Sequence, residues 1–472
     1  MVLLCKSTFT YIIETSGKEE LVMAAKLSAP VDVQIELTQA CNWRCRHCYN
    51  YWRSPGATTR SSQHLSCNDL VRVVQELTTN RVPSITITGG EPFSRRREVF
   101  MLLETVEKAG IHASINTNLS LVSKEDVEKL ANEHGSVSIL FSLLSADAAE
   151  HERLAGAPIG THARVMERAA LAIRRGLPVS LNMVLMRENL HAIEDTARLA
   201  KSLGVQAFCA TKALPNAHAP DAAFLLSAEE VRWSLVELMR LERLLNMPVD
   251  ILGCYPRCLF VDTDAYQRFS HRTCVAGYTT VTVGTDGNVR ACSHMEASYG
   301  NIFHEPLATI WQKMAGWRDG EFVPNECHNC PVVATCRGGC RVNTLTPGLR
   351  NMDFYADPRR LNSQPRERLI SRLPKETDNI PAKVVVCPQV RFRNEPFGAL
   401  AYRTNPLAII LVNHGAASFL KTAVEEKREF SFLSFLEQSG AKTETERRSV
   451  ECLYQKLIRR GFLMTSTDHE GG

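Results

Sequence analysis

The sequence predicts an α/β fold whose central sheet is mostly parallel. From residue 31 to about residue 210, short β-rich runs alternate with amphipathic helical stretches, which is typical of βα units. The expected strands cover residues 31–37, 84–88, 112–116, 136–142, 178–185 and 206–210. They make about six units, too few for a complete eight-stranded barrel. Periodicity alone equally allows an open, doubly wound sheet.

The helices between these strands have recognisable ends. Three of them begin with a capping-box pattern, at Ser66 with Asp69, Ser123 with Asp126, and Ser227 with Glu230. After the first, four apolar residues fall on one helical face: Leu70, Val73, Val74 and Leu77. Glycines stand where C-terminal caps are expected, at Gly110, Gly135, Gly176 and Gly204.

The pattern changes after residue 250. Residues 251–352 are rich in cysteine, glycine and turn residues, and a hairpin is expected from 281–283 and 289–291 around an Asp-Gly turn. Residues 353–381 are polar and proline-rich and are expected to form a linker. Residues 382–472 are predicted to form a small α+β domain, with strands at 390–393, 400–403 and 408–411 before helices at 415–426, 431–439 and 445–460. Residues 1–28 form an N-terminal extension without a clear pattern.

Composition narrows the class of protein. The net charge of +4 comes from 55 basic and 51 acidic residues, so charge gives no indication of a nucleic-acid or membrane partner. No stretch approaches the ~18 apolar residues of a spanning helix, and the first residues lack a signal-peptide pattern. Sixteen cysteines in such a chain indicate metal binding in a reducing cytoplasm rather than structural disulfides.

Three of these cysteines directly follow the first expected strand. Cys41, Cys45 and Cys48 form a CX3CX2C run at the carboxyl end of that strand, where reactive groups collect in α/β folds. A cubic iron-sulfur cluster normally takes four cysteines, so three would leave one iron open. A zinc site or a chance grouping is the alternative interpretation.

The CX3CX2C spacing resembles the signature of the radical S-adenosylmethionine (SAM) enzymes. The resemblance implies a catalytic [4Fe-4S] cluster on Cys41, Cys45 and Cys48, with SAM on the open iron and cleavage to a 5'-deoxyadenosyl radical. The second strand ends in Gly89-Gly90-Glu91-Pro92, which is similar to the segment that meets the SAM amino group in this family. Adjacent glycines allow the backbone to approach a ligand closely. The fold implied for residues 29–250 is a partial (β/α)6 TIM barrel.

The resemblance also implies further SAM contacts. His47 stands where the family usually has an aromatic ring near the adenine, and Asn118 follows the third strand in Thr117-Asn118-Leu119. At the end of the fourth strand Ser142 matches the family pattern, but Leu144 replaces its acidic residue and leaves ribose recognition open. Two more polar candidates are Asn182 and Arg187.

A second field of cysteines follows the barrel region. It contains Cys274-X12-Gly287-X4-Cys292 and Cys327-X2-Cys330-X5-Cys336-X3-Cys340. By itself the second group would suit zinc. Behind a radical SAM core, the two groups resemble an SPASM domain with two auxiliary iron-sulfur clusters. The resemblance assigns Cys274, Cys292 and Cys340 to auxiliary cluster I, and Cys327, Cys330 and Cys336 to auxiliary cluster II.

Each auxiliary cluster then lacks one ligand. Either Cys254 or Cys258 could complete cluster I. For cluster II the family expects a late cysteine, but Arg359 follows the Asp357-Pro358 pair instead. The remaining candidates for that position are Asp353, Asp357, Cys387, a water and the substrate itself.

The segment from Cys387 to Tyr402 resembles the start of the small PqqD-like peptide-binding proteins of the mycofactocin and pyrroloquinoline-quinone pathways, which have a winged-helix-like fold. A strand edge beside a helix can accept a leader peptide. The resemblance implies a maturase of ribosomally made, post-translationally modified peptides (RiPPs), with an electron donor such as flavodoxin or ferredoxin. The alternatives are an SPASM enzyme that oxidises a protein side chain or a small molecule, and a zinc-stabilised winged-helix regulator or scaffold.

Overall fold

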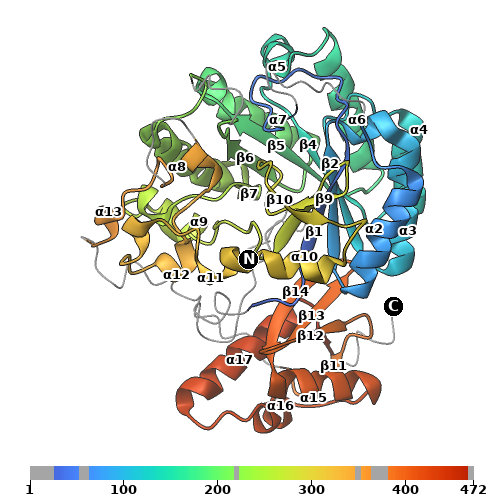
Figure 1. Ribbon diagram of the computed structural model, residues 1–472, viewed down its shortest axis with the longest axis vertical. Coiled ribbons are helices and arrows are strands. Elements are labelled where there is room, and N and C mark those ends of the chain that lie inside the picture. Colours follow the sequence, from blue (N-terminus) through green and yellow to red (C-terminus); the bar gives the residue numbers. More distant parts are fainter. Residues whose placement is uncertain are drawn as a thin grey trace. The chain divides into compact units, whose positions relative to one another are not determined.

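The computed structural model describes residues 26–50, 52, 63–216, 223–345, 352–362 and 381–465. These residues fall into two compact units. The first contains the described residues from 29 to 362, and the second contains residues 26–28 and 381–465. Figure 1 labels their helices and strands.

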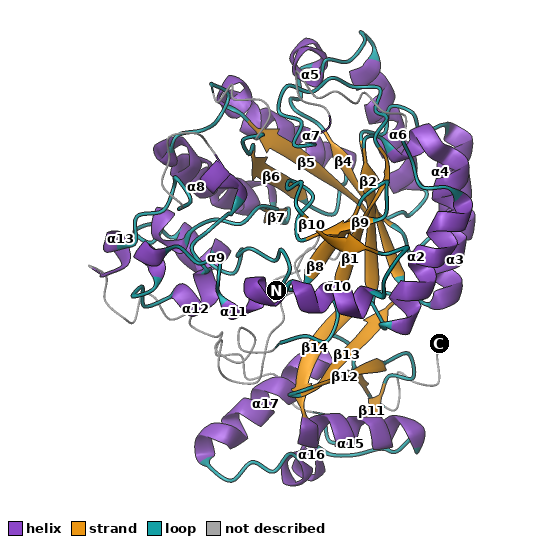
Figure 2. Ribbon diagram, viewed as in Figure 1, coloured by secondary structure: helices purple, strands orange, loops and turns teal. Residues whose placement is uncertain are grey.

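The first unit is built on one large sheet (Figures 1 and 2). Its strands are β1 (Asp32–Thr38), β2 (Ser84–Gly89), β3 (His112–Thr117), β4 (Ser138–Ser142), β5 (Val179–Leu185), β6 (Phe208–Lys212), β7 (Val249–Asp250), β8 (Thr280–Val283), β9 (Asn288–Arg290) and β10 (Ser298–Asn301). They lie in the order β10-β9-β8-β1-β2-β3-β4-β5-β6-β7. All neighbours from β8 to β7 are parallel, whereas β9 and β10 pair antiparallel. The mostly parallel α/β fold is therefore confirmed.

Two features of this sheet were not predicted. The two-residue strand β7 is too short to leave a sequence signal. The strand β8 pairs parallel with β1 as well as forming the expected hairpin with β9. This pairing brings the second cysteine field beside the strand that precedes Cys41.

Helices connect the parallel strands and cover the sheet (Figure 2). They are α2 (Cys67–Thr79), α3 (Arg96–Ala109), α4 (Lys124–Glu133), α5 (Ala148–Ala155), α6 (Thr161–Arg174), α7 (Ile193–Leu203) and α8 (Ala228–Leu245). All three predicted capping boxes are present, and the four predicted apolar residues of α2 are buried. Gly110 and Gly204 are the C-cap residues of α3 and α7, as expected. At α4 and α6 the C-cap residues are His134 and Arg175, one position before the expected Gly135 and Gly176.

Residues 251–362 form short elements around the second cysteine field. They are η4 (Arg257–Leu259), α9 (Ala265–Phe269), α10 (Leu307–Lys313), α11 (Ala315–Asp319), η5 (Asn325–Cys327), α12 (Val333–Cys336), η6 (Val342–Leu345) and α13 (Arg359–Asn362). The expected start of the linker, residue 353, lies too early in the chain. Asp353 is fully buried, and the Tyr355 hydroxyl donates to the Leu226 carbonyl at 2.8 Å. The segment up to residue 362 therefore packs within the first unit, while residues 363–380 lie outside the described residues.

The second unit has its own sheet and core. An antiparallel sheet contains β12 (Arg391–Glu395), β13 (Gly398–Thr404) and β14 (Leu407–Asn413), followed by α15 (His414–Glu425), α16 (Phe432–Gln438) and α17 (Glu444–Arg459). The short strands β11 (Val385–Val386) and β15 (Leu463–Met464) pair separately. Aromatic rings of Phe419, Phe430, Phe435 and Tyr454 pack together in the core. The three predicted strands and three predicted helices of the α+β unit are present, and its winged-helix character stays a prediction.

Candidate active site and cysteine clusters

The CX3CX2C loop leaves β1 and is held by contacts from several other elements. The Arg44 N–H donates to the Ala155 carbonyl at 3.0 Å, and Asn216 Nδ2 donates to the Cys48 carbonyl at 3.0 Å. Trp43 is buried with its ring edge-on to His151 at 5.2 Å between centroids. All three cysteines remain partly exposed. The loop is thus anchored by its backbone and by Trp43, while its three cysteine residues are not fully buried.

The glycine pair after β2 packs against this loop. The Gly90 N–H donates to the Thr38 carbonyl at 2.6 Å, and the Glu91 N–H donates to the Ala40 carbonyl at 2.8 Å. A Cβ atom on Gly89 would lie 2.5 Å from the Thr38 oxygen, and one on Gly90 would lie 2.0 Å from the Ala40 oxygen. Gly89 also has φ +126°, which disfavours any residue with a side chain. In this structure, close approach of the cysteine loop itself requires both glycines.

Glu91 faces the protein rather than open space. Its carboxylate accepts from the Thr117 hydroxyl at 2.6 Å and from the Asn118 N–H at 2.7 Å, and it also caps η2 (Pro92–Arg95). Burial raises the pKa of Glu91 to about 6, although these hydrogen bonds oppose the shift. Glu91 therefore holds the end of β3 against the end of β2.

Asn118 reaches the cysteine loop. Its Nδ2 donates to Asn42 Oδ1 at 2.9 Å and lies 4.0 Å from Cys41 Sγ, while its Oδ1 accepts from Ser120. Of the predicted SAM contacts, Asn118 has a side chain that the structure brings against the CX3CX2C loop. His47 lies within that loop, and burial lowers its pKa to about 4, so its ring is neutral at neutral pH.

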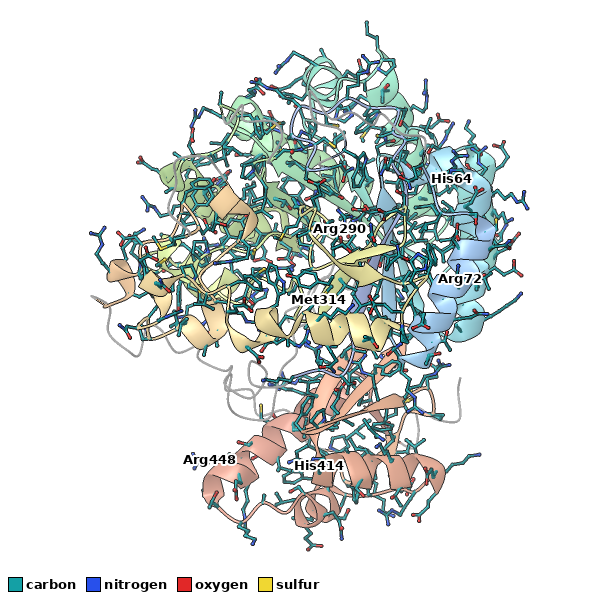
Figure 3. All side chains as sticks on the ribbon, viewed as in Figure 1. His64, Arg72, Arg290, Met314, His414 and Arg448 are labelled. Atoms are coloured by element: carbon teal, nitrogen blue, oxygen red, sulfur yellow. The ribbon has the colours of Figure 1, made fainter. Side chains whose placement is uncertain are left out.

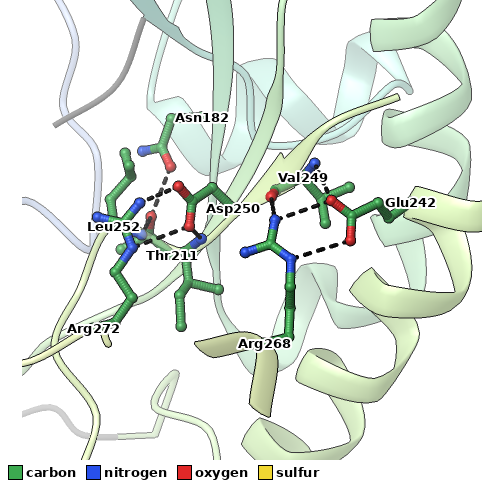
Figure 4. Close-up of polar contacts among 9 residues, drawn as sticks. Asn182, Thr211, Glu242, Val249, Asp250, Leu252, Arg268 and Arg272 are labelled. Atoms are coloured by element: carbon green, nitrogen blue, oxygen red, sulfur yellow. Dashed lines mark hydrogen bonds and ion pairs between the residues drawn. The ribbon is translucent and has the colours of Figure 1, made fainter. Parts of the chain in front are cut away.

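The other predicted contacts lie further round the sheet. Ser142 and Asn182 are register partners on β4 and β5, and Asn182 Oδ1 accepts from the Thr211 hydroxyl at 2.8 Å (Figure 4). Arg187 begins η3 (Arg187–Ala192) and pairs with Glu230 of α8 at 3.2 Å, with its side chain half exposed. Arg187 is therefore held away from β4 and β5, toward the surface of α8.

The second cysteine field separates into two groups. In the first, the Cys254 thiol hydrogen-bonds the thiols of Cys274 and Cys340, which raises the pKa of Cys254 and lowers the pKa values of its two partners. Burial raises the pKa of Cys292 to about 12, and the charges of Cys274 and Cys340 add to the shift. Cys254 is therefore grouped with the three cysteines expected to hold auxiliary cluster I.

The second group contains Cys327, Cys330 and Cys336. The Cys330 N–H donates to the Cys327 carbonyl at 3.0 Å, and Cys336 follows on α12. Burial raises the pKa of Cys327 to about 11, and the charges of Cys336 and Cys330 contribute. Cys258 lies beside this group, because its neighbour Arg257 donates a backbone N–H to Cys336 Sγ at 3.3 Å.

The donor chemistry of the three groups fits iron-sulfur clusters. None of the fifteen cysteines in the described ranges forms a disulfide bond. Within those same ranges, no three His, Cys, Asp or Glu side chains converge closely enough to hold a single metal ion. In a cubic cluster each thiolate binds a different iron, so the ligands do not have to converge on a single ion.

Three features of the site had not been found from the sequence. Glu36 on β1 and Arg290 on β9 form a buried ion pair. Arg290 is labelled in Figure 3. Tyr49 stacks on His294 with 4.2 Å between ring centroids, which joins the first cysteine loop to the segment after Cys292. Glu36 and Tyr49 stand near the first cysteine motif in the sequence, but the sequence does not show that they contact Arg290 and His294.

Lys212 is the third such feature. It ends β6 almost fully buried, with its Nζ 4.5 Å from the centre of the Tyr255 ring and without a hydrogen-bond partner in the described residues. Burial acts to lower the pKa of Lys212, but the charges of Tyr255, Cys340, Asp353 and Cys254 outweigh it, so the pKa is raised. A lysine two residues after the expected strand 206–210 was the available signal.

Two segments of the first unit match known protein families. Residues 35–200 match the model of the radical SAM superfamily, and residues 274–331 match SPASM, described as an iron-sulfur cluster-binding domain. The protein is an enzyme built on a radical SAM domain. Its radical SAM domain binds a [4Fe-4S] cluster and SAM, and its SPASM domain binds auxiliary iron-sulfur clusters. These matches set aside the interpretation as a zinc-stabilised regulator or scaffold.

Several known proteins are similar to this chain. The AdoMet-dependent heme synthase of Methanosarcina barkeri is 26% identical over 68% of this chain and 93% of that protein. The subtilosin biosynthesis protein AlbA of Bacillus subtilis is 27% identical over 71% of each chain. The structure of Streptococcus suis SuiB bound to precursor peptide SuiA has a TM-score of 0.55 and 20% identity, covers 71% of this chain and 76% of SuiB, and shows the shared fold. No helix among the described residues is long and apolar enough to cross a membrane.

Proposed function

We propose that the protein is a maturase that modifies a ribosomally made precursor peptide. When bound, the [4Fe-4S] cluster and SAM supply a 5'-deoxyadenosyl radical that abstracts a hydrogen atom. Cys41, Cys45 and Cys48 hold that cluster, and Asn118 provides a polar contact beside Cys41. Flavodoxin or ferredoxin delivers the electron in the cytoplasm. Cross-linking, epimerisation, decarboxylation and excision all begin with the same abstraction.

The roles of the other site residues follow from their contacts. The Gly89-Gly90 pair keeps the cysteine loop close to β2, and Glu91 keeps Asn118 in position through the Asn118 N–H. His47 is neutral, so it provides an uncharged ring beside the third cysteine. Ser142 at the end of β4 and Asn182 in the middle of β5 present neighbouring polar groups. Arg187 is held by Glu230 and acts at the rim.

The observation that carries the peptide proposal is the second unit. It has its own core, and β14 pairs with β13 on one side while no strand in the described residues pairs with its other side. An extended leader peptide can add to such an edge through backbone hydrogen bonds. Relatives named for precursor peptides support this substrate class, since AlbA takes part in subtilosin biosynthesis and SuiB binds the peptide SuiA.

A second candidate function is haem synthesis. The match to the heme synthase covers 93% of that protein but only 68% of this chain. About a third of this chain therefore has no counterpart in that match, and a small-molecule reaction gives no reason for an additional peptide-binding unit. An SPASM enzyme that oxidises a protein side chain would likewise not need it.

The test is anaerobic incubation of the full chain with reductant, SAM and the short peptide encoded next to its gene. We expect 5'-deoxyadenosine together with a mass change of the peptide. Truncation after Pro381 removes the β12–β14 sheet and should abolish binding of a labelled leader, while Cys452→Ala in the same unit should bind normally. Equal leader affinity of the truncated chain would refute the recognition role, and haem formation without peptide modification would favour the second candidate.

A further inference from the structure

We propose that Cys258 is the fourth thiolate of auxiliary cluster II, together with Cys327, Cys330 and Cys336. The inference rests on the assignment of auxiliary clusters to the SPASM domain, and it is independent of the peptide substrate. It gives a thiol to the cluster for which the expected late cysteine is missing. It also separates two cysteines that are only four positions apart, Cys254 and Cys258.

Cys258 lies beside the second cysteine group. It is in the middle of η4 (Arg257–Leu259) and is buried. The preceding residue, Arg257, donates its backbone N–H to Cys336 Sγ at 3.3 Å. The backbone directly before Cys258 therefore contacts the sulfur of Cys336, a member of the second group.

The sulfurs of Cys258 and Cys336 both accept hydrogen bonds from backbone amides. The Asp357 N–H donates to Cys258 Sγ at 3.1 Å, as the Arg257 N–H donates to Cys336 Sγ. Amide bonds to ligand sulfurs stabilise thiolates and help to set the potential of an iron-sulfur cluster. Asp357 is the residue after which the family's late cysteine was expected, so this segment does reach cluster II, but it contributes an amide to the sulfur of Cys258.

Cys254 belongs to the other group. Its thiol bonds those of Cys274 and Cys340, whereas the thiols near Cys258 are those of Cys336, Cys327 and Cys330. Cys254 and Cys258 therefore lie beside different sets of thiols, although four positions separate them in the chain.

The rival ligands are engaged by other groups. The Asp353 carboxylate accepts the Cys340 N–H at 2.7 Å, the Tyr355 N–H at 3.0 Å and Asn343 Nδ2 at 3.0 Å. The Asp357 carboxylate pairs with Arg359 at 2.8 Å. Cys387 is buried in the core of the second unit. Asp353 thus supports a cysteine of cluster I, and neither aspartate is available as a free ligand of cluster II.

The segment that carries Cys258 is held firmly. Arg257 Nε donates to the Ser270 carbonyl at 2.8 Å, and Arg360 Nη1 donates to the Leu259 carbonyl at 3.0 Å. These bonds hold both ends of η4. With four protein thiolates, cluster II has no iron left open for a substrate, so the inference assigns it to electron transfer.

The test compares cysteine variants of the full chain after anaerobic purification and reconstitution. Three four-iron clusters correspond to roughly 12 iron per chain. In Cys258→Ala we expect the loss of up to about four iron or an altered cluster, and the same electron paramagnetic resonance signal should change as in Cys336→Ala. Cys254→Ala and Cys274→Ala should change the signal of the other auxiliary cluster. Cys209→Ala, in a buried cysteine of β6, is the matched control and should keep the full iron content.

Two outcomes would overturn the inference. One is a Cys258→Ala protein whose iron content and spectra match those of the wild type. The other is a Cys258→Ala protein that changes the signal sensitive to Cys254→Ala. If Cys258→Ala does not fold, Cys258→Ser keeps an oxygen ligand at the same position and should alter the Mössbauer signal of one iron of cluster II. An unaltered Mössbauer spectrum in that variant would equally contradict the assignment.

Discussion

Substitution of Gly90 by alanine tests how the catalytic loop is held. A Cβ atom on this residue would lie 2.0 Å from the Ala40 carbonyl oxygen, whereas ordinary contact begins at 3.4 Å, a shortfall of 3.4 − 2.0 = 1.4 Å. The added Cβ atom would clash with backbone atoms of Ala40 and Gln39, so no side-chain rotation can relieve the clash. The segment that leads into Cys41 must therefore move away from β2 by about the same distance.

The displacement breaks two hydrogen bonds at the root of the loop. The Gly90 N–H bond to Thr38 is 2.6 Å long and the Glu91 N–H bond to Ala40 is 2.8 Å, and each contributes about 1 kcal/mol. A displacement of about 1 Å at a reacting centre can lower a rate about 100-fold. We therefore expect Gly90→Ala to form 5'-deoxyadenosine from SAM at least about 100-fold more slowly than the wild type.

The assay is 5'-deoxyadenosine formation with excess dithionite, with iron content and circular dichroism measured on the same sample. Gly135→Ala is the matched control, because its Cβ would lie 3.3 Å from the Ala131 oxygen, at the end of α4. The control should cleave SAM normally. A Gly90→Ala enzyme with wild-type iron content and a wild-type rate would refute the view that this contact positions the loop.

Three further variants test buried charges around the site. Arg290→Leu leaves Glu36 buried without its partner and should cost about 3 kcal/mol in urea unfolding, most of which Glu36→Gln should restore in the double variant. Lys212→Met removes a positive charge near Cys254 and Cys340, so the potential of auxiliary cluster I should fall in a redox titration, and an unchanged potential would contradict that placement. Burial raises the pKa of Glu91 from 4.5 to about 6. Its contribution to the free energy of unfolding is therefore present below pH 4.5 and decreases by about 2 kcal/mol as the pH rises through 6. Glu91→Gln should remove this pH dependence from unfolding curves.

Much of the fold followed from local patterns. Each capping box depends on two residues three positions apart, and the buried face of α2 depends on residues within about two turns. The sequence therefore carries both signals directly. The CX3CX2C run is similarly local, because its three thiols belong to one short loop. The start of the linker was misjudged, since the charges and prolines after Asp353 conceal two buried residues, Asp353 and Tyr355.

By itself the sequence determined the α/β class, the cysteine loop after β1, the two cysteine groups and a separate α+β tail. Only the tertiary structure decided which group Cys254 and Cys258 each join, because they differ by four positions in the chain but face thiols 20 to 86 positions further on. It also decided the pairing of Glu36 with Arg290 and the burial of Lys212 beside Tyr255. Such contacts depend on how β8 and β9 come to lie beside β1, and spacing along the chain does not carry that information.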